Sequence, residues 1–267
     1  MPRISETPFV VLDTETTGAD TAKDKPIELA YAIVKNFEVS MPKSWLIDPQ
    51  RMIPPEASAV HHLVDEDVAG QKTFEELWPE VEPELRGQVI VAHNASFDIA
   101  MLPPLRDNPV LCTLRLARHL WPRGAVNARG FPLSNHQQQV IRYWLGLKID
   151  TMGLGAHRAA ADILVTAELF KTQLRLYLEC GGEDDLDALI DFATSPIEVK
   201  SLSFGKHANE PLPKVPTSYL EYLVEKDGDR PLDPDLKASI KRELDTRKAE
   251  VIVSTRTATT APSPPKS

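Results

Sequence analysis

The chain has few of the features that mark secreted, zinc-binding or membrane proteins. Its 267 residues include two cysteines, Cys112 and Cys180, and neither has a nearby cysteine or a pair of histidines. We therefore expect no disulfide framework or zinc site, and a reducing cytoplasm is the expected localisation. No stretch approaches the roughly 20 apolar residues that span a bilayer. The first residues also lack the pattern of a secretory leader, so no membrane association is expected.

Positive charge is scarce and unevenly distributed. The formal net charge is −9, although phosphate binding needs Lys and Arg. Residues 106–160, however, carry eight basic and two acidic residues, whereas the stretch between Arg175 and Lys200 carries seven acidic residues and no Lys or Arg. The basic segment permits a polyanionic substrate, and a solvated surface explains it equally well.

Apolar periodicity predicts strands that alternate with helices. Short runs rich in Val and Ile predict strands at 8–12, 28–34, 44–48 and 88–94. Helical spacing covers 55–63, 74–85, 95–102, 111–120, 135–145 and 158–178. This order predicts an α/β sheet with helices on its faces.

Changes in composition predict the domain organisation. We expect a main domain at 1–180, an acidic linker at 181–195, a small C-terminal module at 196–250 and a disordered tail at 251–267. The segment 122–135 has the composition of a loop, and its role stays open.

Carboxylates follow two of the predicted buried strands. Asp13 and Glu15 are two residues apart at the end of the first strand, so both side chains face the same side. Asp98 follows the strand at 88–94 in the sequence HNASFD, where it would lie near Asp13 if the two strands are neighbours. Carboxylate oxygens suit Mg²⁺ or Mn²⁺, which retain water and accept substrate phosphate oxygens. In the same motif, Asn94 could be a helix cap, and Phe97 a core residue or a base-stacking one.

A third motif, AHRAAAD, places His157 and Asp162 at the start of a long predicted helix. Five helical residues correspond to about 500° of rotation and roughly 7.5 Å of rise, so the two side chains should not share one ligand position. A histidine held apart from a metal and aimed at a water fits the role of a general base. The acids and the histidine together outline phosphodiester hydrolysis with two divalent ions.

These motifs in this order resemble the DEDDh exonuclease family, in its exodeoxyribonuclease X branch. LDTETTG, HNASFD and AHRAAAD carry the resemblance, and IPPEASAVHHLVDED, LCTLRLARHLWP and SFGKHANEPL extend it. It implies a ribonuclease-H-like mixed sheet flanked by helices, with a small C-terminal appended unit. It also implies a 3′→5′ exonuclease that acts on DNA with a free 3′ end, single-stranded or duplex, in repair or proofreading. Repair or replication proteins are possible partners.

The resemblance also implies residue roles. Asp13, Glu15, Asp98 and Asp162 correspond to the ligands of two Mg²⁺ or Mn²⁺ ions, and His157 to the general base. Residues that correspond to the family's nucleotide-binding positions are Thr16, Thr17, Val60 and His61, to which we add Asn94 and Phe97. For His61, a core or capping role is an equal alternative.

Other functions remain possible from the residues alone. The same carboxylates could cleave RNA, as in ribonuclease T or oligoribonuclease, because both polymers present the same phosphodiester. A non-catalytic interaction module on this fold is less consistent with the retention of all five catalytic residue types. An aspartyl-phosphate phosphatase would need a second aspartate where Glu15 stands, and no phosphate-binding G-x-x-x-x-G-K-[ST] motif is present.

Overall fold

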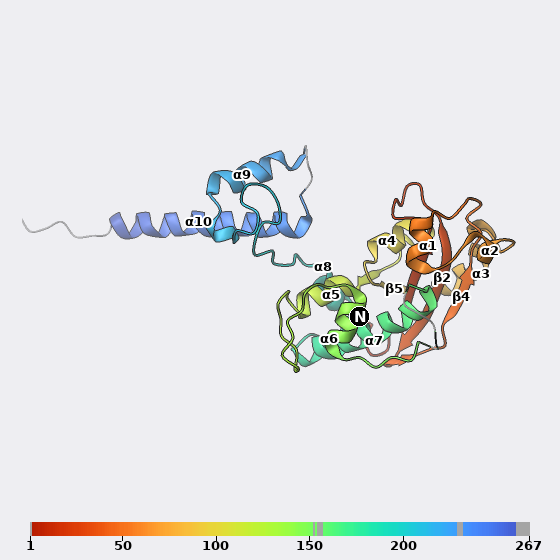
Figure 1. Ribbon diagram of the computed structural model, residues 1–267. Helices are drawn as coiled ribbons and strands as arrows, with labels where there is room; N and C mark the ends of the chain where they lie inside the picture. The colour runs from red at the N-terminus through yellow and green to blue at the C-terminus, as the bar shows by residue number, and fades with distance from the viewer. Residues whose placement is uncertain (1, 152, 154–156, 229–231, 260–267) are drawn as a thin grey trace, which may run out of the picture. The chain divides into compact units, whose positions relative to one another are not determined.

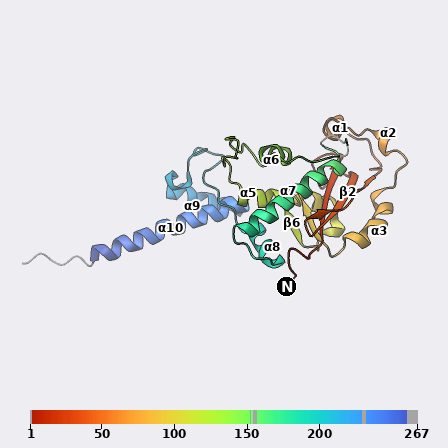
Figure 2. The same ribbon diagram turned by 90° about the horizontal axis from the view of Figure 1, so that it is seen from below.

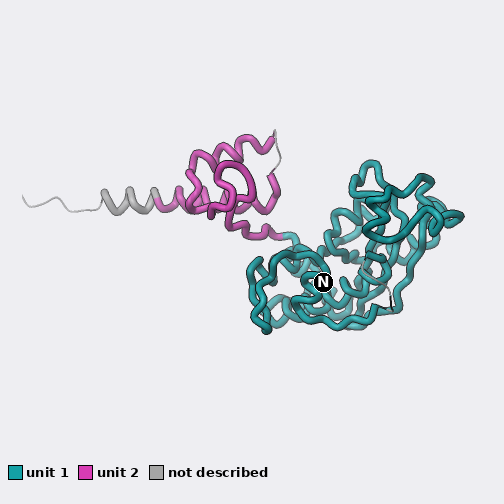
Figure 3. Tube along the Cα trace, viewed as in Figure 1, with its two compact units in different colours: residues 1–194 teal, residues 195–267 magenta. Residues whose placement is uncertain are grey.

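The computed structural model describes residues 2–151, 153, 157–228 and 232–259, with side chains up to residue 250. The chain divides into two compact units, unit 1 at residues 1–194 and unit 2 at residues 195–267 (Figure 3). Each unit has its own hydrophobic core.

Unit 1 is built on a mixed sheet, as expected (Figure 1). Its strands are β1 (Phe9–Thr16), β2 (Pro26–Lys35), β3 (Glu38–Val39), β4 (Lys43–Leu46), β5 (Val89–Ala92) and β6 (Val110–Cys112). The strand order is β3-β2-β1-β5-β6, and β4 also pairs with β2. β1 runs antiparallel to β2 and parallel to β5, which runs parallel to β6. Part of the helix expected at 111–120 is therefore strand β6.

Helices cover both faces of this sheet. They are α1 (Pro55–His61), α2 (Asp65–Val68), α3 (Phe74–Leu85), α4 (Ser96–Met101), the 3-10 turn η1 (Pro103–Leu105), α5 (Thr113–Leu120), α6 (Gln138–Leu145), α7 (Ala159–Glu179) and α8 (Leu186–Thr194). Among the helices that the structure describes, none is long and apolar enough to cross a membrane.

The alternation of side chains along β1 decides where the polar residues point. Phe9 and Val11 pack in one core cluster with α7, whereas Val10 and Leu12 pack in the other with α3. Figure 2 shows α7 lying across one side of the strands, with α3 on the other. Because the period of a strand is two, Asp13 and Glu15 continue the series of Phe9 and Val11 and face α7.

The acidic segment after α7 differs from the expected linker. Residues 186–194 form α8, and Leu186, Leu189 and Ala193 are buried in the core cluster beneath α7. The acids lie on the other side of this amphipathic helix, where Asp187 and Asp191 are exposed. Unit 1 therefore extends to residue 194 rather than 180.

Unit 2 consists of short helices and one long helix around a leucine-rich core. Its elements are η2 (Leu212–Lys214), α9 (Thr217–Glu225), η3 (Lys226–Gly228) and α10 (Pro234–Thr259). α9 packs on α10 through Leu220, Leu223 and Ile240. The tail expected to be disordered from residue 251 instead continues α10 to Thr259, and residues 260–267 lie outside the described residues.

Candidate active site

Three carboxylates meet at the end of β1. Asp13 and Glu15 come from the strand and Asp162 from the first turn of α7. One carboxylate oxygen of each lies within 4.8 Å of those of the other two. A set of oxygen donors alone is the coordination that hard divalent cations such as Mg²⁺ and Mn²⁺ prefer. These residues therefore fit a divalent metal ion.

Asp98 lies beside this cluster and is held by the strand. It comes from α4, is 3% exposed, and its Oδ1 accepts hydrogen bonds from the backbone N–H of Thr14 at 3.2 Å and from Thr14 Oγ1 at 2.9 Å. Its charge raises the pKa of Asp13. Sequence reasoning placed Asp98 near Asp13, and the structure does the same.

The electrostatics of the cluster are those of crowded acids. Burial, followed by the charges of Asp98 and Glu15, raises the pKa of Asp13 well above its usual value. Burial, followed by the charge of Asp162, raises the pKa of Glu15 to about 8. Burial also raises the pKa of Asp98 to about 7, although the hydrogen bonds from Thr14 oppose the shift. A bound cation would favour the ionised forms of these groups.

His157 lies just before α7 and is not one of the clustered ligands. Its backbone N–H donates to Asp162 Oδ2 at 3.0 Å, and its φ is 61°, in the left-handed region. The side chain is exposed and lines the same groove as Asp13 and Asp162. Among the described residues, the group with metal-binding spacing contains Asp162 without His157. His157 precedes α7 and is not helical, so the helical spacing expected between His157 and Asp162 does not apply.

A further buried carboxylate, Glu28, fixes the start of α7. Glu28 stands opposite Glu15 in the β1–β2 register and is 1% exposed. Its Oε2 accepts from Arg158 Nε at 3.1 Å and from the backbone N–H of Ala159 at 3.2 Å, while its Oε1 accepts from Ser44 Oγ at 2.9 Å. Because Arg158 and Ala159 begin α7, Glu28 anchors the helix that carries Asp162 to the sheet.

Glutamines at the start of α6 hold Asp162 from the other side. Gln139 Nε2 donates to Asp162 Oδ1 at 3.0 Å, and Gln138 Nε2 donates to the backbone oxygen of Asp162 at 3.0 Å. The segment before α6 is held by His93, whose ring nitrogens contact Thr113 Oγ1 at 2.9 Å and the backbone oxygen of His136 at 3.0 Å. Burial lowers the pKa of His93 to about 4, so this imidazole is neutral at pH 7.

The candidate nucleotide-binding residues near β1 have mixed surroundings. Thr16 Oγ1 donates to the backbone oxygen of Gly18 at 2.7 Å, and Thr17 Oγ1 donates to Asp24 Oδ1 at 3.0 Å. Both hydroxyls thus hold the loop between β1 and β2. His61 is 2% exposed and its Nδ1 accepts from the backbone N–H of Leu63, so it has the capping contact that we considered. Burial lowers the pKa of His61. Val60, in contrast, is 49% exposed.

Asn94 and Phe97 differ in their access to the groove. Asn94 is exposed, adopts a left-handed φ of 71° and lines the groove with Asp13. Phe97 is half-buried and is not among the residues that line it.

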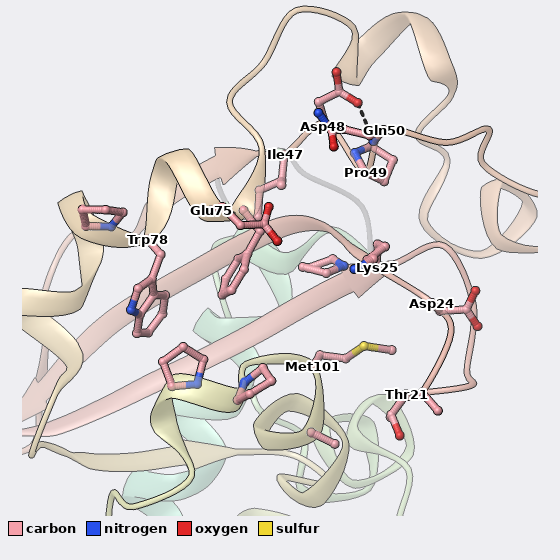
Figure 4. Close-up of a pocket in the computed structure, with 17 residues that line it drawn as sticks. Thr21, Asp24, Lys25, Ile47, Asp48, Pro49, Gln50, Glu75, Trp78 and Met101 are labelled. Carbon is pink, nitrogen blue, oxygen red and sulfur yellow. Dashed lines mark hydrogen bonds between the residues drawn. The ribbon is translucent and has the colours of Figure 1, made fainter.

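The groove itself has a volume of about 760 Å³ and is lined by charged residues of both signs. Asp13 and Asp162 contribute carboxylates, and Arg118 and Arg123 contribute cations. A separate cavity of about 570 Å³ lies between α3, α4 and the loop after β4, where Trp78, Met101 and Ile47 give it an apolar lining (Figure 4). None of the candidate catalytic residues lines that cavity, whereas Asp13, His157 and Asp162 line the groove.

Sequence reasoning missed Glu28, Gln139 and His93 as parts of the site. Glu28 had a visible signal, since it is a charged residue inside the otherwise apolar run Ile27–Val34. The glutamines gave no local signal, because their contact with Asp162 joins residues 23 or 24 positions apart.

Comparisons with known proteins agree with this geometry. Residues 10–170 match the model of a family described as Exonuclease (RNase_T), a range that includes Asp13, Glu15, Asp98, His157 and Asp162. The chain is 29% identical to exodeoxyribonuclease 10 of Escherichia coli K12, over 88% of this chain and 98% of that protein. It is 30% identical to the DNA polymerase III subunit epsilon of Treponema pallidum, over 65% of this chain and 80% of that protein. A match to the PolC-type DNA polymerase III of Clostridium perfringens, at 31% identity, covers 73% of this chain and only 13% of that polymerase.

Solved structures show the same likeness. Exonuclease X in complex with 5′-overhanging duplex DNA superposes with a TM-score of 0.57 at 28% identity, over 69% of this chain and 99% of that one. Exonuclease I of E. coli with a dA16 oligonucleotide superposes with a TM-score of 0.51 at 20% identity, over 65% of this chain and 43% of that one, which shows the shared fold.

Proposed function

The chain belongs to the Exonuclease family, and from this premise we propose that it hydrolyses phosphodiester bonds at the 3′ ends of DNA. The observation that carries the proposal is the meeting of Asp13, Glu15 and Asp162 within 4.8 Å. Asp13 and Asp162 line a groove that His157 also lines. Oxygen ligands beside an exposed imidazole are the requirements of metal-assisted hydrolysis.

Two Mg²⁺ or Mn²⁺ ions are the proposed cofactors. Asp13, Glu15 and Asp162 would hold them, with Asp98 as the fourth acid. When bound, such ions polarise the phosphate and stabilise negative charge on the attacking and leaving oxygens. The crowded acids support this assignment, because each carboxylate raises the pKa of its neighbours unless a cation is present.

The remaining residues orient these ligands and move a proton. His157 accepts the proton of the attacking water at its imidazole and releases it to solvent through its exposed edge. Glu28 and Gln139 hold α7 and the Asp162 carboxylate in position from opposite sides. Thr14 fixes the Asp98 carboxylate. Rigid support of this kind lowers the cost of reaching the reactive geometry.

DNA is the proposed substrate because of the relatives. The E. coli relative is named an exodeoxyribonuclease, and its match at 239 residues is longer than unit 1. Exonuclease X was solved with duplex DNA that has a 5′ overhang, which presents a recessed 3′ end. A role in DNA repair or proofreading is consistent with the polymerase subunits among the relatives. The free cysteines Cys112 and Cys180 suit the reducing cytoplasm.

The test is a parallel digestion of end-labelled single-stranded DNA, recessed duplex DNA and RNA with Mg²⁺. We expect stepwise loss of nucleotides from DNA 3′ ends, no loss with EDTA, and slower digestion of RNA. A preparation of Asp162→Asn controls for contaminating nucleases. Faster cleavage of RNA than of DNA would contradict the substrate assignment, and cleavage without a divalent ion would contradict the metal.

A further inference from the structure

The segment 122–135 is a braced hairpin rather than an irregular loop. The backbone N–H of Gly124 donates to the oxygen of Leu133 at 3.0 Å, and that of Leu133 donates to the oxygen of Ala125 at 2.8 Å. Leu133 is 1% exposed and packs with Trp121 and Ile141, so the base of the hairpin is anchored in a core cluster. Backbone hydrogen bonds and a buried leucine therefore hold the base of the hairpin in place.

Side-chain hydrogen bonds fasten the far end of the hairpin to α6. Trp144 Nε1 donates to the backbone oxygen of Phe131 at 2.8 Å, and Asn127 Nδ2 donates to the backbone oxygen of Trp144 at 2.7 Å. Arg129 Nη2 also donates to the backbone oxygen of Tyr143 at 2.5 Å. The backbone of Phe131 is therefore fastened to Trp144, and that of Tyr143 to Arg129, so the end of the hairpin is held against α6.

Large side chains on this braced element remain in solvent. Phe131 is 62% exposed and Tyr143 is 66% exposed. The Arg142 guanidinium lies over the Tyr143 ring at 5.3 Å from its centroid. Aromatic faces mixed with arginine are the composition of surfaces that stack the bases of single strands.

The base of the same hairpin lines the catalytic groove. Arg123 at its start, and Arg118 on α5, line the groove with Asp13 and Asp162. Both arginines are exposed, and in the described part of the chain neither lies within ion-pairing distance of a carboxylate. In a protein of net charge −9, two such cations beside the acidic cluster complement a polyanion that enters the groove.

We propose that the hairpin and α6 form a second, non-catalytic subsite for the single strand that lies 5′ of the cleaved nucleotide. Arg118 and Arg123 bind its phosphates where it leaves the groove, and Phe131 and Tyr143 stack on its bases. This inference rests on the proposed exonuclease function. It predicts that Phe131 and Tyr143 do not raise kcat/KM on substrates too short to extend beyond the groove.

The phosphate contacts are tested by salt dependence. Wild type and the double variant Arg118→Gln/Arg123→Gln digest a thymidine trinucleotide and a thymidine 20-mer over a range of KCl concentrations. The slope of log(kcat/KM) against log[salt] is negative, and each lost phosphate contact makes it less negative by roughly 0.7 for single strands. We therefore expect the slope on the 20-mer to become less negative by about 1.4. Arg86→Gln, at the end of α3, is the matched control, since Arg86 is paired with Glu82 outside the groove.

The stacking contacts are tested by substrate length. Phe131→Ala and Tyr143→Ala should each lower kcat/KM on the 20-mer by at least about fivefold, since stacking contributes ~1–3 kcal/mol per base. The ratio of kcat/KM on the 20-mer to that on the trinucleotide should fall by the same factor. Met41→Ala removes a similarly exposed apolar side chain, 77% exposed, and controls for nonspecific effects.

The outcomes separate the two proposals. If wild type digests neither oligonucleotide, the exonuclease assignment fails. If wild type digests both, but the variants keep its salt slope and its length ratio, the subsite is absent, and the aromatic surface serves another ligand such as a protein. Equal losses on both lengths from Phe131→Ala or Tyr143→Ala would place these aromatic side chains at the cleaved nucleotide and also overturn the subsite.

Discussion

In unit 2, Asp227, Asp233 and Asp235 each have their own hydrogen-bond donor. Asp235 is 5% exposed and accepts from the backbone N–H of Ile197 at 3.1 Å, and Asp233 accepts from the backbone N–H of Leu236 at the start of α10. Asp227 pairs with Lys237, and the hydrogen bond from this lysine lowers the pKa of Asp227. At the end of β1 in unit 1, by contrast, Asp13 and Glu15 lie close to other carboxylates, and their pKa values are raised.

The contrast separates charges that stabilise a fold from charges retained for chemistry. An acid with a donor favours the folded state, whereas acids that crowd each other oppose it until a cation arrives. Strongly perturbed groups in a cleft are candidates for function, and unit 1 has them where the family match also lies. Five predictions test this contrast.

The largest effect is expected at the acidic cluster. Asp162→Asn should abolish nuclease activity, with a loss of at least about 10²-fold, because a metal ligand contributes several kcal/mol to the transition state. The metal-free variant should melt at a temperature equal to or above that of wild type, since a repelling charge is gone. Digestion of labelled DNA and a thermal melt measure both. Activity within tenfold of wild type would remove Asp162 from the metal site.

His157 should act on rate without acting on metal. We expect His157→Ala to lower kcat by roughly 10²–10⁴-fold, the usual contribution of a general base. Affinity for Mn²⁺, titrated by calorimetry, should stay close to wild type, because the imidazole is not one of the clustered ligands. A parallel loss of Mn²⁺ affinity and rate would instead make His157 a ligand.

The Arg158–Glu28 pair connects the acidic cluster to a cation. Arg158→Ala leaves the carboxylate of Glu28, 1% exposed, without its partner, and should lower the free energy of unfolding by about 2–4 kcal/mol. This expected loss is smaller than that for a fully buried ion pair, because the Arg158 side chain is 31% exposed. Arg86→Ala breaks a surface pair with Glu82 and should cost less than about 1 kcal/mol. Urea denaturation compares the two, and equal losses would contradict the role of Glu28.

The crowded acids predict how stability depends on pH without metal. The pKa of Glu15 is about 8 in the folded chain against an ordinary value of 4.5, so the folded state binds more protons between these values. The free energy of unfolding should therefore fall as pH rises from about 5 to 8. Saturating Mg²⁺ should flatten this dependence, because it binds the ionised carboxylates. Thermal melts with EDTA and with Mg²⁺ measure this pH dependence. A rise in stability with pH over this range in EDTA would contradict the prediction.

The smallest effect is expected from removing unit 2. A chain that ends at Thr194 keeps the core residue Ala193 and should fold and digest a trinucleotide within about threefold of the full chain, because no candidate catalytic residue lies beyond it. An end at Asp191, inside the segment expected to be a linker, would remove Ala193 and its backbone oxygen, which accepts from Arg115 Nε. Circular dichroism and initial rates test this boundary. A folded but inactive unit 1 would assign unit 2 to the active site.

Local patterns were enough to predict that the candidate catalytic acids meet at one end of the sheet. The two-residue period of β1 places Asp13 and Glu15 on one face, the motif around Asp98 directly follows β5, and Asp162 lies in the first turn of α7. Interactions between distant segments were not predictable in this way. Glu28 meets Arg158 across 130 residues, and the braces of the hairpin join residues whose partners carry no periodic signal.

Two other elements were not predicted, α8 because of its charge and β6 because of its neighbouring helix. The acids around α8 indicated a linker, although Leu186 and Leu189 already have the three-residue spacing of a buried helical face. The three residues of β6, 110–112, are followed directly by α5. The apolar residues of both elements together therefore fit the spacing of one helix. Only pairing with β5 identifies this segment as a strand.

The alternating faces of β1 also bear on how this gene can change. A single codon inserted or deleted between Val11 and Asp13 would exchange the two faces of the strand beyond that point. The carboxylates would then point into the apolar layer beneath α3, so the lineage can accept substitutions in β1 but no change in its length. The hairpin at 122–135 carries none of the clustered ligands, so a change in its length would leave Asp13 and Glu15 on their face of the strand.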